Sequence, residues 1–249
     1  MSQALPRLYS DLAGWYLLVT APEEYVEEAV FYWDCFASTA TGPLTTLLEL
    51  GSGSGAMASH YKRHITTTLT DISADMLALS QTVNPELEHV QGDMRTLRIG
   101  RQFDAVFIHD AIMYLTTEDD LRQAIVTAAE HLRPGGVAVL APDCVLETFQ
   151  PRTETGGNDG DGRALRYMEW SHDPDPTDTT CVADYTYVYR EGDGIPVCEV
   201  ERHTFGLFSR QVWLRLLDEA GFDATIKPLV HSEVEPGEVE VFVSVKRPT

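Results

Sequence analysis

Three glycines at alternate positions are the residues of this sequence whose type and spacing most clearly suggest chemistry. Gly51, Gly53 and Gly55 follow the leucine-rich run 47–50, and the residues after them, 56–64, are compatible with a helix. Glycine adopts positive φ and has no Cβ, so such a strand–turn–helix lets the backbone approach a ligand closely. Its N–H groups and the helix dipole favour a carboxylate or phosphate. By itself the turn fits a nucleotide-sized ligand or an ordinary glycine-rich connection.

Acidic residues follow several of the predicted strands. Asp71 comes about 20 residues after the glycines, where an acidic residue binds ribose hydroxyls in nucleotide-binding βαβ units. A helix cap is the alternative, but Ser73 can fill that role. The other polar residues at or near predicted strand ends are Glu49, Asp93, His109 and Asp143. The carboxyl ends of parallel strands share one edge, where ligands bind in such sheets.

The elements that must position these residues alternate between strand and helix from residue 47 to 140. This alternation predicts a parallel sheet covered on both faces. The predicted strands are 47–50, 65–70, 87–91, 103–108 and 137–140. A helix is expected from Thr117 to about Leu132, ended by the following Pro-Gly-Gly. Segments 224–230 and 239–245 are predicted to complete the sheet as an antiparallel pair.

Two regions flank this core. The aromatic segment 8–16 is either a strap on the core or a cap whose Tyr9 and Tyr16 line a cavity. The runs 165–170, 181–189 and 196–203, separated by loop signals, predict an antiparallel insertion. The inner face of that insertion, which includes Cys181 and Tyr187, could pack on the main domain, form a dimer contact or roof a cavity. The predicted divisions are a cap at 1–40, a main domain at 41–145 and 205–249, and the insertion at 146–204.

Composition narrows the classes of function. The formal net charge of −21 argues against a nucleic-acid surface and makes a cationic or neutral small substrate easier to attract than a polyanion. No apolar run is long enough for a leader or a membrane span, so we expect a cytoplasmic protein without membrane or nucleic-acid partners. The four cysteines lack a Cys-x-x-Cys pair, which predicts buried thiols and no metal.

Four separated stretches resemble the ordered motifs of class I S-adenosylmethionine-dependent methyltransferases, closely over about residues 45–143. These stretches are Glu49-x-Gly51-x-Gly53-x-Gly55, Asp71-Ile72-Ser73 with Met76-Leu77, Gly92-Asp93-Met94, and 103–106 with 132–136. The resemblance implies a Rossmann-like, mostly parallel α/β sheet with its last strand antiparallel and helices on both faces. A dehydrogenase is the competing interpretation, because Gly51-x-Gly53-x-x-Ala56 also fits the relaxed dinucleotide pattern.

The resemblance also implies roles for individual residues. Glu49 and the loop 51–55, with Ser52, would hold the methionyl part of S-adenosylmethionine, and Asp71 would bind the ribose. Ile72, with Met76 in the same motif, belongs to the adenine side, where Asp93 would meet the adenine amino group beside Gly92 and the Met94 backbone. His109 and Asp110 would flank the sulfonium.

The aromatic amino-terminal segment and the insertion more narrowly resemble small-molecule N-methyltransferases, including the aminodeoxysugar N,N-dimethyltransferases of antibiotic pathways. The expected reaction is methyl transfer to a nitrogen of a small-molecule acceptor, leaving S-adenosylhomocysteine. The alternatives are O-methylation of a small hydroxylated metabolite and a non-catalytic module that binds the cofactor. A homodimer through the insertion is also expected.

Alignment of the acceptor should contribute more than a base, roughly 7 to 11 against 3 to 5 kcal/mol. His109 is the candidate base, because an imidazole pKa near 6.5 suits proton acceptance at neutral pH. A hydrogen-bonded wall residue is the alternative role for this histidine. Tyr9 is the second catalytic candidate, and together with Tyr16 and Tyr114 it is expected to shape the acceptor cavity and contact a developing cation.

Overall fold

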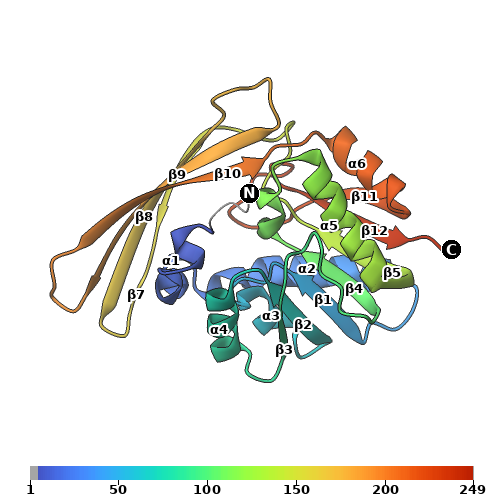
Figure 1. Ribbon diagram of the computed structural model, residues 1–249, viewed down its shortest axis with the longest axis horizontal. Coiled ribbons are helices and arrows are strands. Elements are labelled where there is room, and N and C mark those ends of the chain that lie inside the picture. The colour runs from blue at the N-terminus through green and yellow to red at the C-terminus, as the bar shows by residue number, and fades with distance from the viewer. Residues whose placement is uncertain (1–4, 249) are drawn as a thin grey trace.

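Two β-sheets lie side by side in the computed structural model, which describes residues 5–248 (Figure 1). The main sheet has the order β11-β12-β5-β4-β1-β2-β3. Strands β1 to β5 pair in parallel, whereas β12 is antiparallel to β5 and to β11. The bounds are β1 (Thr46–Leu50), β2 (Thr66–Asp71), β3 (Glu88–Gln91), β4 (Phe103–Ile108), β5 (Leu132–Leu140), β11 (Phe222–Pro228) and β12 (Glu240–Lys246). The predicted fold class is confirmed.

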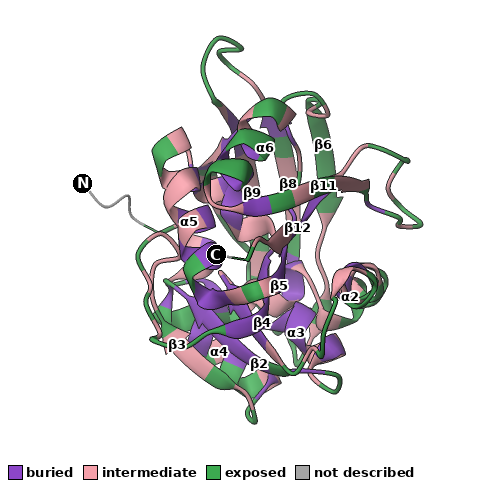
Figure 2. Cartoon of the chain, turned by 90° about the vertical axis from the view of Figure 1, so that its right-hand side faces the viewer, coloured by how far each residue is buried: buried purple, intermediate pink, exposed green. Residues whose placement is uncertain are grey.

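Helices cover both faces of the main sheet, which explains why β4 is apolar throughout. Phe107 packs on the side of α2 (Val26–Thr39) and α3 (Ala56–Tyr61), with Tyr32 and Phe36. The next residue, Ile108, belongs to the opposite layer with α5 (Glu118–His131) and α6 (Arg210–Glu219). A further helix, α4 (Ala74–Val83), contacts β2 and β3. Figure 2 shows burial concentrated in the strands between these helices.

The insertion forms the second, antiparallel sheet, with the order β10-β9-β8-β6 and β7 paired to β8. Its strands are β6 (Arg152–Gly156), β7 (Asp159–Gly160), β8 (Arg163–His172), β9 (Thr180–Glu191) and β10 (Val197–Gly206). The sequence predicted the three long strands, but not β6 and β7. Most of β6 is exposed, so no alternation of apolar residues marks it as a strand.

The amino-terminal segment lies between the two sheets (Figure 1). It comprises η1 (Arg7–Tyr9), η2 (Ala13–Trp15), α1 (Tyr16–Val19) and η3 (Pro22–Tyr25), which leads into α2. Leu8, Leu18 and Val19 bury themselves against Leu165 and Tyr187 on the inner face of the insertion. That face therefore packs on the amino-terminal segment, and part of it also faces the cavity described below.

Three details differ from the sequence-based expectations. Helix α3 ends at Tyr61 instead of residue 64, and His64 stacks on Trp33 with ring centroids 5.0 Å apart. Helix α5 ends directly at β5, before the Pro-Gly-Gly. Cys35 and Cys181 are buried thiols as predicted, but Cys198 is exposed. Within residues 5–248, none of the helices has the length and apolar character needed to cross a bilayer.

Candidate functional site

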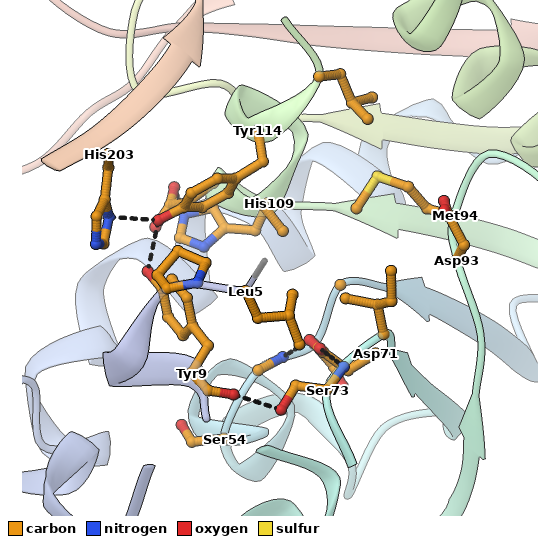
Figure 3. Close-up of a pocket in the computed structure, with 18 of the residues that line it drawn as sticks. Leu5, Tyr9, Ser54, Asp71, Ser73, Asp93, Met94, His109, Tyr114 and His203 are labelled. Atoms are coloured by element: carbon orange, nitrogen blue, oxygen red, sulfur yellow. Dashed lines mark hydrogen bonds and ion pairs between the residues drawn. The ribbon is translucent and has the colours of Figure 1, made fainter. Parts of the chain in front are cut away.

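A cavity of about 900 Å³ opens at the carboxyl ends of the parallel strands (Figure 3). The amino-terminal segment, the glycine turn, η4 (Asp110–Tyr114) and strand β10 all contribute to its wall. The predicted residues that line it are Tyr9, Tyr16, Glu49, Gly51, Ser52, Gly53, Asp71, Ile72, Gly92, Asp93, Met94, His109, Asp110 and Tyr114. Gly55 and Met76 were also predicted for the site, but they are not among the lining residues.

Gly55 and Met76 support the turn from behind. The carbonyl of Gly55 accepts a hydrogen bond of 2.8 Å from the Asn84 side chain. A Cβ at Gly55 would lie 2.5 Å from that Asn84 nitrogen, so a larger residue does not fit. Met76 is 1% exposed, and its methyl group lies 3.7 Å from the position of a Cβ at Gly53. Both residues fix the shape of the turn without facing the cavity.

The glycine turn has the expected backbone, with φ of +74°, +53° and +69° at Gly51, Gly53 and Gly55. Three of its N–H groups, however, already donate to acceptors within the fold. Gly51 and Ser52 each donate to the Thr70 carbonyl at 2.8 Å, and Gly53 donates to Asp71 at 2.8 Å. These three N–H groups already have acceptors at the end of the adjacent strand β2, so anion binding at this turn stays a prediction for the N–H groups at the start of α3.

The turn also leaves room for a ligand beside Gly51 and carries the buried Ser52 hydroxyl. A Cβ at Gly51 would lie 2.5 Å from the Ala111 Cβ and 2.9 Å from the Met94 methyl group. The Ser52 hydroxyl is buried and has no hydrogen-bond partner among residues 5–248. A buried polar atom without a partner is costly, so this oxygen is suited to meet a ligand.

Two buried carboxyl groups border this part of the cavity. Asp71 accepts from the Ser73 N–H at 2.8 Å as well as from Gly53, and each of its oxygens retains a second lone pair. Burial raises the pKa of Asp71, although these backbone hydrogen bonds oppose the shift. Burial also raises the pKa of Glu49 to about 7, against the opposing effect of the Tyr61 hydroxyl that donates to it.

Asp93 is held by a neighbour that the sequence did not reveal. Arg95 donates to its carboxylate through Nε at 3.0 Å and Nη2 at 2.6 Å, and its Nη1 reaches Asp120 at 2.8 Å. The Arg95 guanidinium holds the pKa of Asp93 below its usual range. Any ligand that meets Asp93 must therefore share this carboxylate with Arg95.

His109 lies between two carboxylates. Its Nε2 is 3.1 Å from Glu28 and 3.0 Å from Asp110, and its ring stacks on Phe107 with centroids 5.7 Å apart. Burial lowers the pKa of His109, but the two carboxylates outweigh burial and hold it well above its usual range. A protonated imidazole has no lone pair to accept a proton. These surroundings favour the wall role over the predicted base role.

His203 is the second histidine of the cavity, and its pKa is shifted in the opposite direction from that of His109. The Tyr114 hydroxyl lies 3.1 Å from the Tyr9 hydroxyl and 2.8 Å from Nδ1 of His203, which lines the cavity from β10 (Figure 3). Burial lowers the pKa of His203, although Glu201, 3.4 Å from its Nε2, opposes this. His203 is therefore neutral near pH 7 and able to accept a proton. No sequence motif marked it, because β10 only joins the site in three dimensions.

The amino-terminal segment connects the two ends of the cavity. The Tyr9 hydroxyl meets Tyr114, while the Tyr9 carbonyl accepts a hydrogen bond of 2.5 Å from the Ser73 hydroxyl. Ser73 also accepts from the Met76 N–H as the amino-terminal cap of α4. Tyr9 thus bridges the tyrosine–histidine group and the end of β2 that carries Asp71.

Comparisons of the sequence and of the fold with known proteins show the family of this chain. Residues 47–136 match a family model described as a methyltransferase domain. A dTDP-3-amino-3,4,6-trideoxy-alpha-D-glucopyranose N,N-dimethyltransferase from Streptomyces venezuelae is 36% identical over 51% of this chain, and the match spans about half (54%) of that relative. A dTDP-3-amino-3,6-dideoxy-alpha-D-glucopyranose N,N-dimethyltransferase from Streptomyces fradiae is 30% identical over 74% of this chain and 72% of its own length.

Solved structures show the same fold over nearly the whole chain. DesVI from Streptomyces venezuelae superposes with a TM-score of 0.81 at 24% identity, covering 98% of this chain and 100% of its own. CalS10 from Micromonospora echinaspora, described as a SAM-bound amino pentose methyltransferase, gives 0.76 at 21% identity and 99% coverage of both chains.

The residues of the cavity fit the cofactor of this family. Glu49 and Asp71 offer carboxyl groups for an ammonium and for ribose hydroxyls, and the Ser52 hydroxyl lacks a partner within the described chain. Ile72, which is 44% exposed, offers an apolar side chain to a purine. The volume lies within the usual range for ligand sites, roughly 300 to 1,000 Å³. The chain belongs to the class I S-adenosylmethionine-dependent methyltransferases, and S-adenosylmethionine is its cofactor.

Proposed function

We propose that this enzyme methylates a nitrogen of a small-molecule amine in natural-product biosynthesis. The observation that carries the proposal is a single cavity whose wall includes both the Asp71 end and the Tyr9–Tyr114–His203 group. The N,N-dimethyltransferase relatives support nitrogen as the acceptor atom. The aminosugars in their names support a small-molecule acceptor of similar size.

We assign the roles in the cofactor half from the family and from the place of each residue in the cavity wall. Asp71 receives the ribose, Glu49 and Ser52 hold the methionyl part, and Ile72 packs on the adenine. Gly51, which tolerates no side chain, lets the cofactor lie close to the strand ends. Asp93 and Met94 border the adenine, with Arg95 sharing the Asp93 carboxylate. Gly53, Gly55, Gly92 and Met76 shape the backbone around these groups.

The acceptor half aligns the amine and removes its proton. When bound, the cofactor supplies an electrophilic methyl group on a positively charged sulfur. Asp110 holds the amine, whose nitrogen must lose a proton to present its lone pair. Tyr9 Oη takes that proton as its own passes to Tyr114 Oη, and the Tyr114 proton passes to Nδ1 of His203. The distances of 3.1 and 2.8 Å are short enough for this transfer.

The rest of the wall keeps this geometry in place. His109, charged and paired with Glu28 and Asp110, orients the Asp110 carboxylate. Tyr16 and Tyr25 close the side of the cavity nearest the amino-terminal segment. Alignment remains the larger contribution to rate, so we assign the proton transfer a supporting role.

Methyl transfer from labelled cofactor tests the proposal. The pure enzyme is incubated with methyl-labelled S-adenosylmethionine and a panel of amino sugars, simple amines and phenols, and the products are analysed by mass spectrometry. We expect label on amine nitrogen and none on the phenols. Label on hydroxyl oxygen would replace nitrogen as the acceptor atom. S-adenosylhomocysteine binding without transfer to any acceptor would favour the non-catalytic module.

Three further parts belong to the same proposal. The chain divides into a cap (1–40), a cofactor domain (41–145 and 205–249) and an insertion (146–204).

The outer face of the insertion exposes Met168, Trp170, Val188 and Val200, which supports a homodimer through this sheet. Analytical ultracentrifugation tests this dimer. Four free cysteines fit a reducing, cytoplasmic location, tested by cell fractionation.

A further inference from the structure

We infer that Glu201 is a positioning residue that fixes the tautomer of His203 and, through it, the direction of proton movement at the acceptor end. This inference rests on the proposed function, because it concerns the proton path through Tyr9 and Tyr114. It starts from two buried polar atoms, Glu201 Oε2 and His203 Nε2, which have no hydrogen-bond partner among residues 5–248.

Strand β10 carries Glu201 and His203 on the same face of the insertion, because the two residues are two positions apart. Both residues line the cavity, and their side chains are only 13% and 1% exposed. Glu201 Oε2 lies 3.4 Å from His203 Nε2, a longer distance than the roughly 2.9 Å of an ordinary hydrogen bond. Catalytic contacts of this length often shorten in the substrate complex. The carboxylate and the imidazole therefore act on each other electrostatically, with no other polar partner between them.

This contact selects one tautomer of the neutral imidazole. A carboxylate can only accept a hydrogen bond, so the ring nitrogen that faces Glu201 must carry the hydrogen. With hydrogen on Nε2, the lone pair is on Nδ1, and the Tyr114 hydroxyl 2.8 Å away donates to it. The Tyr114 oxygen is then left to accept from the Tyr9 hydroxyl, 3.1 Å away. The other tautomer would reverse both hydrogen bonds, and His203 could not receive a proton from Tyr114.

The amino-terminal segment holds the other oxygen of Glu201. The backbone N–H of Arg7, the first residue of η1, donates to Glu201 Oε1 at 2.5 Å. A backbone N–H can only donate, so this position requires an acceptor. If an amide replaced the carboxylate, its oxygen would have to face Arg7 and its NH₂ group would have to face His203. Glutamine at position 201 should therefore impose the opposite tautomer on His203.

Glu201 also supplies the charge that balances the proton on His203. The titratable side chains around this ring are Tyr9 from η1, Tyr114 from η4, Tyr185 from β9 and Glu201 from β10 itself. Burial raises the pKa of all three tyrosines, so they are neutral near pH 7. In the proposed path the amine loses one proton, Nδ1 of His203 gains one and Nε2 keeps its hydrogen. The imidazolium thus forms beside the Glu201 carboxylate, which stabilises it.

Nitrogen NMR of the histidine side chains tests the tautomer directly. Enzyme grown with isotope-labelled histidine is saturated with S-adenosylhomocysteine, and the signals lost in His203→Gln identify His203. Near neutral pH we expect hydrogen on Nε2 in the wild type and on Nδ1 in Glu201→Gln. Hydrogen on Nδ1 in the wild type, or the same tautomer in both proteins, would overturn the inference.

Turnover tests whether this tautomer serves the reaction. Glu201→Gln should lower kcat on an amine acceptor about tenfold, with the affinity for S-adenosylhomocysteine unchanged. Tyr114→Phe interrupts the same path, so the double variant should lose no more than either single variant. A wild-type kcat in Glu201→Gln, or losses that multiply in the double variant, would overturn the inference while leaving nitrogen methylation intact. If the wild type methylates no amine, the proposed function fails, and the NMR measurement still decides the inference.

Glu199→Gln is the matched control. Glu199 lies two residues earlier on β10 and binds the Arg7 guanidinium at 2.6 Å, but it is outside the cavity wall. The substitution removes the same charge from the same strand, so we expect the wild-type tautomer of His203 and the wild-type kcat. Equal losses of kcat in Glu199→Gln and Glu201→Gln would mean that both residues act through Arg7 instead of His203, and would overturn the inference.

Discussion

The two ends of the cavity are built in different ways. At the cofactor end, the backbone N–H groups of the turn donate to the end of strand β2: Gly51 and Ser52 to the Thr70 carbonyl, and Gly53 to the Asp71 carboxylate. At the acceptor end, side chains from three distant segments meet through Tyr9, Tyr114 and His203. Backbone contacts leave little freedom, whereas side chains can be exchanged one at a time. Substitutions should therefore cause large losses of binding at the cofactor end and smaller, separate losses of turnover at the acceptor end.

Asp71→Ala should have the largest effect. It removes the acceptor for two backbone N–H groups and the proposed ribose contact, so affinity for S-adenosylhomocysteine should fall about 100-fold or more. Isothermal titration calorimetry measures this loss. Asp75→Ala, an exposed position in the first turn of α4, is the control and should bind normally. Normal binding by Asp71→Ala would place the cofactor elsewhere.

Glu49→Gln should change how stability depends on pH. Because burial raises the pKa of Glu49 to about 7, ionising it in the folded protein costs free energy as pH rises from 4.5 to 7. Wild type therefore loses stability over this interval that the glutamine variant keeps. From pH 5 to pH 8 the variant should gain about 2 kcal/mol relative to wild type.

Urea unfolding at several pH values, without cofactor, measures this difference. A constant difference between Glu49→Gln and wild type across the range would mean that Glu49 titrates in the folded protein as it does in the unfolded chain.

Tyr114→Phe tests the acceptor end, where we expect a smaller effect. Losing the hydroxyl between Tyr9 and His203 interrupts the proposed proton path, so kcat should fall about tenfold while cofactor affinity stays unchanged. Steady-state kinetics and calorimetry together separate the two quantities. Tyr189→Phe is the matched control, since Tyr189 packs on Trp15 outside the cavity wall. Equal losses in both variants would remove the hydroxyl from the proposed path.

His109→Gln should have the smallest effect on turnover. His109 is already protonated beside Glu28 and Asp110, and glutamine keeps a hydrogen-bond donor there. We expect kcat on an amine acceptor to fall by about threefold at most, with the pH profile of kcat unchanged. A drop of about 100-fold, with an inflection of that profile lost, would restore His109 as the base.

The sequence predicted the two ends unequally, for a physical reason. The main sheet, the positive φ of Gly51 to Gly55 and the position of Asp71 follow from short-range patterns of apolar residues and glycines. The acceptors of the Gly51, Ser52 and Gly53 N–H groups could not be predicted, because they lie on strand β2, nearly 20 residues away. Local pattern gives the conformation of a segment but not its partner.

The acceptor end shows more clearly that local sequence patterns do not reveal contacts between distant segments. Tyr114 and His203 are 89 residues apart, and Tyr9 and Tyr114 are 105 apart. Tyr9 and Tyr114 were selected as aromatic candidates, but nothing near His203 in the sequence indicates that β10 reaches the cavity. The opposite protonation of His109 and His203 likewise depends on carboxylates and burial that only the folded chain defines.

The hydrogen bond from Ser73 to the Tyr9 carbonyl has a practical consequence for protein engineering. Residues 5, 6 and 9 form part of the cavity wall, and this carbonyl anchors them beside Asp71. Trimming the first ten residues to improve expression, or fusing a rigid tag to them, would therefore disturb both binding partners of the enzyme at once.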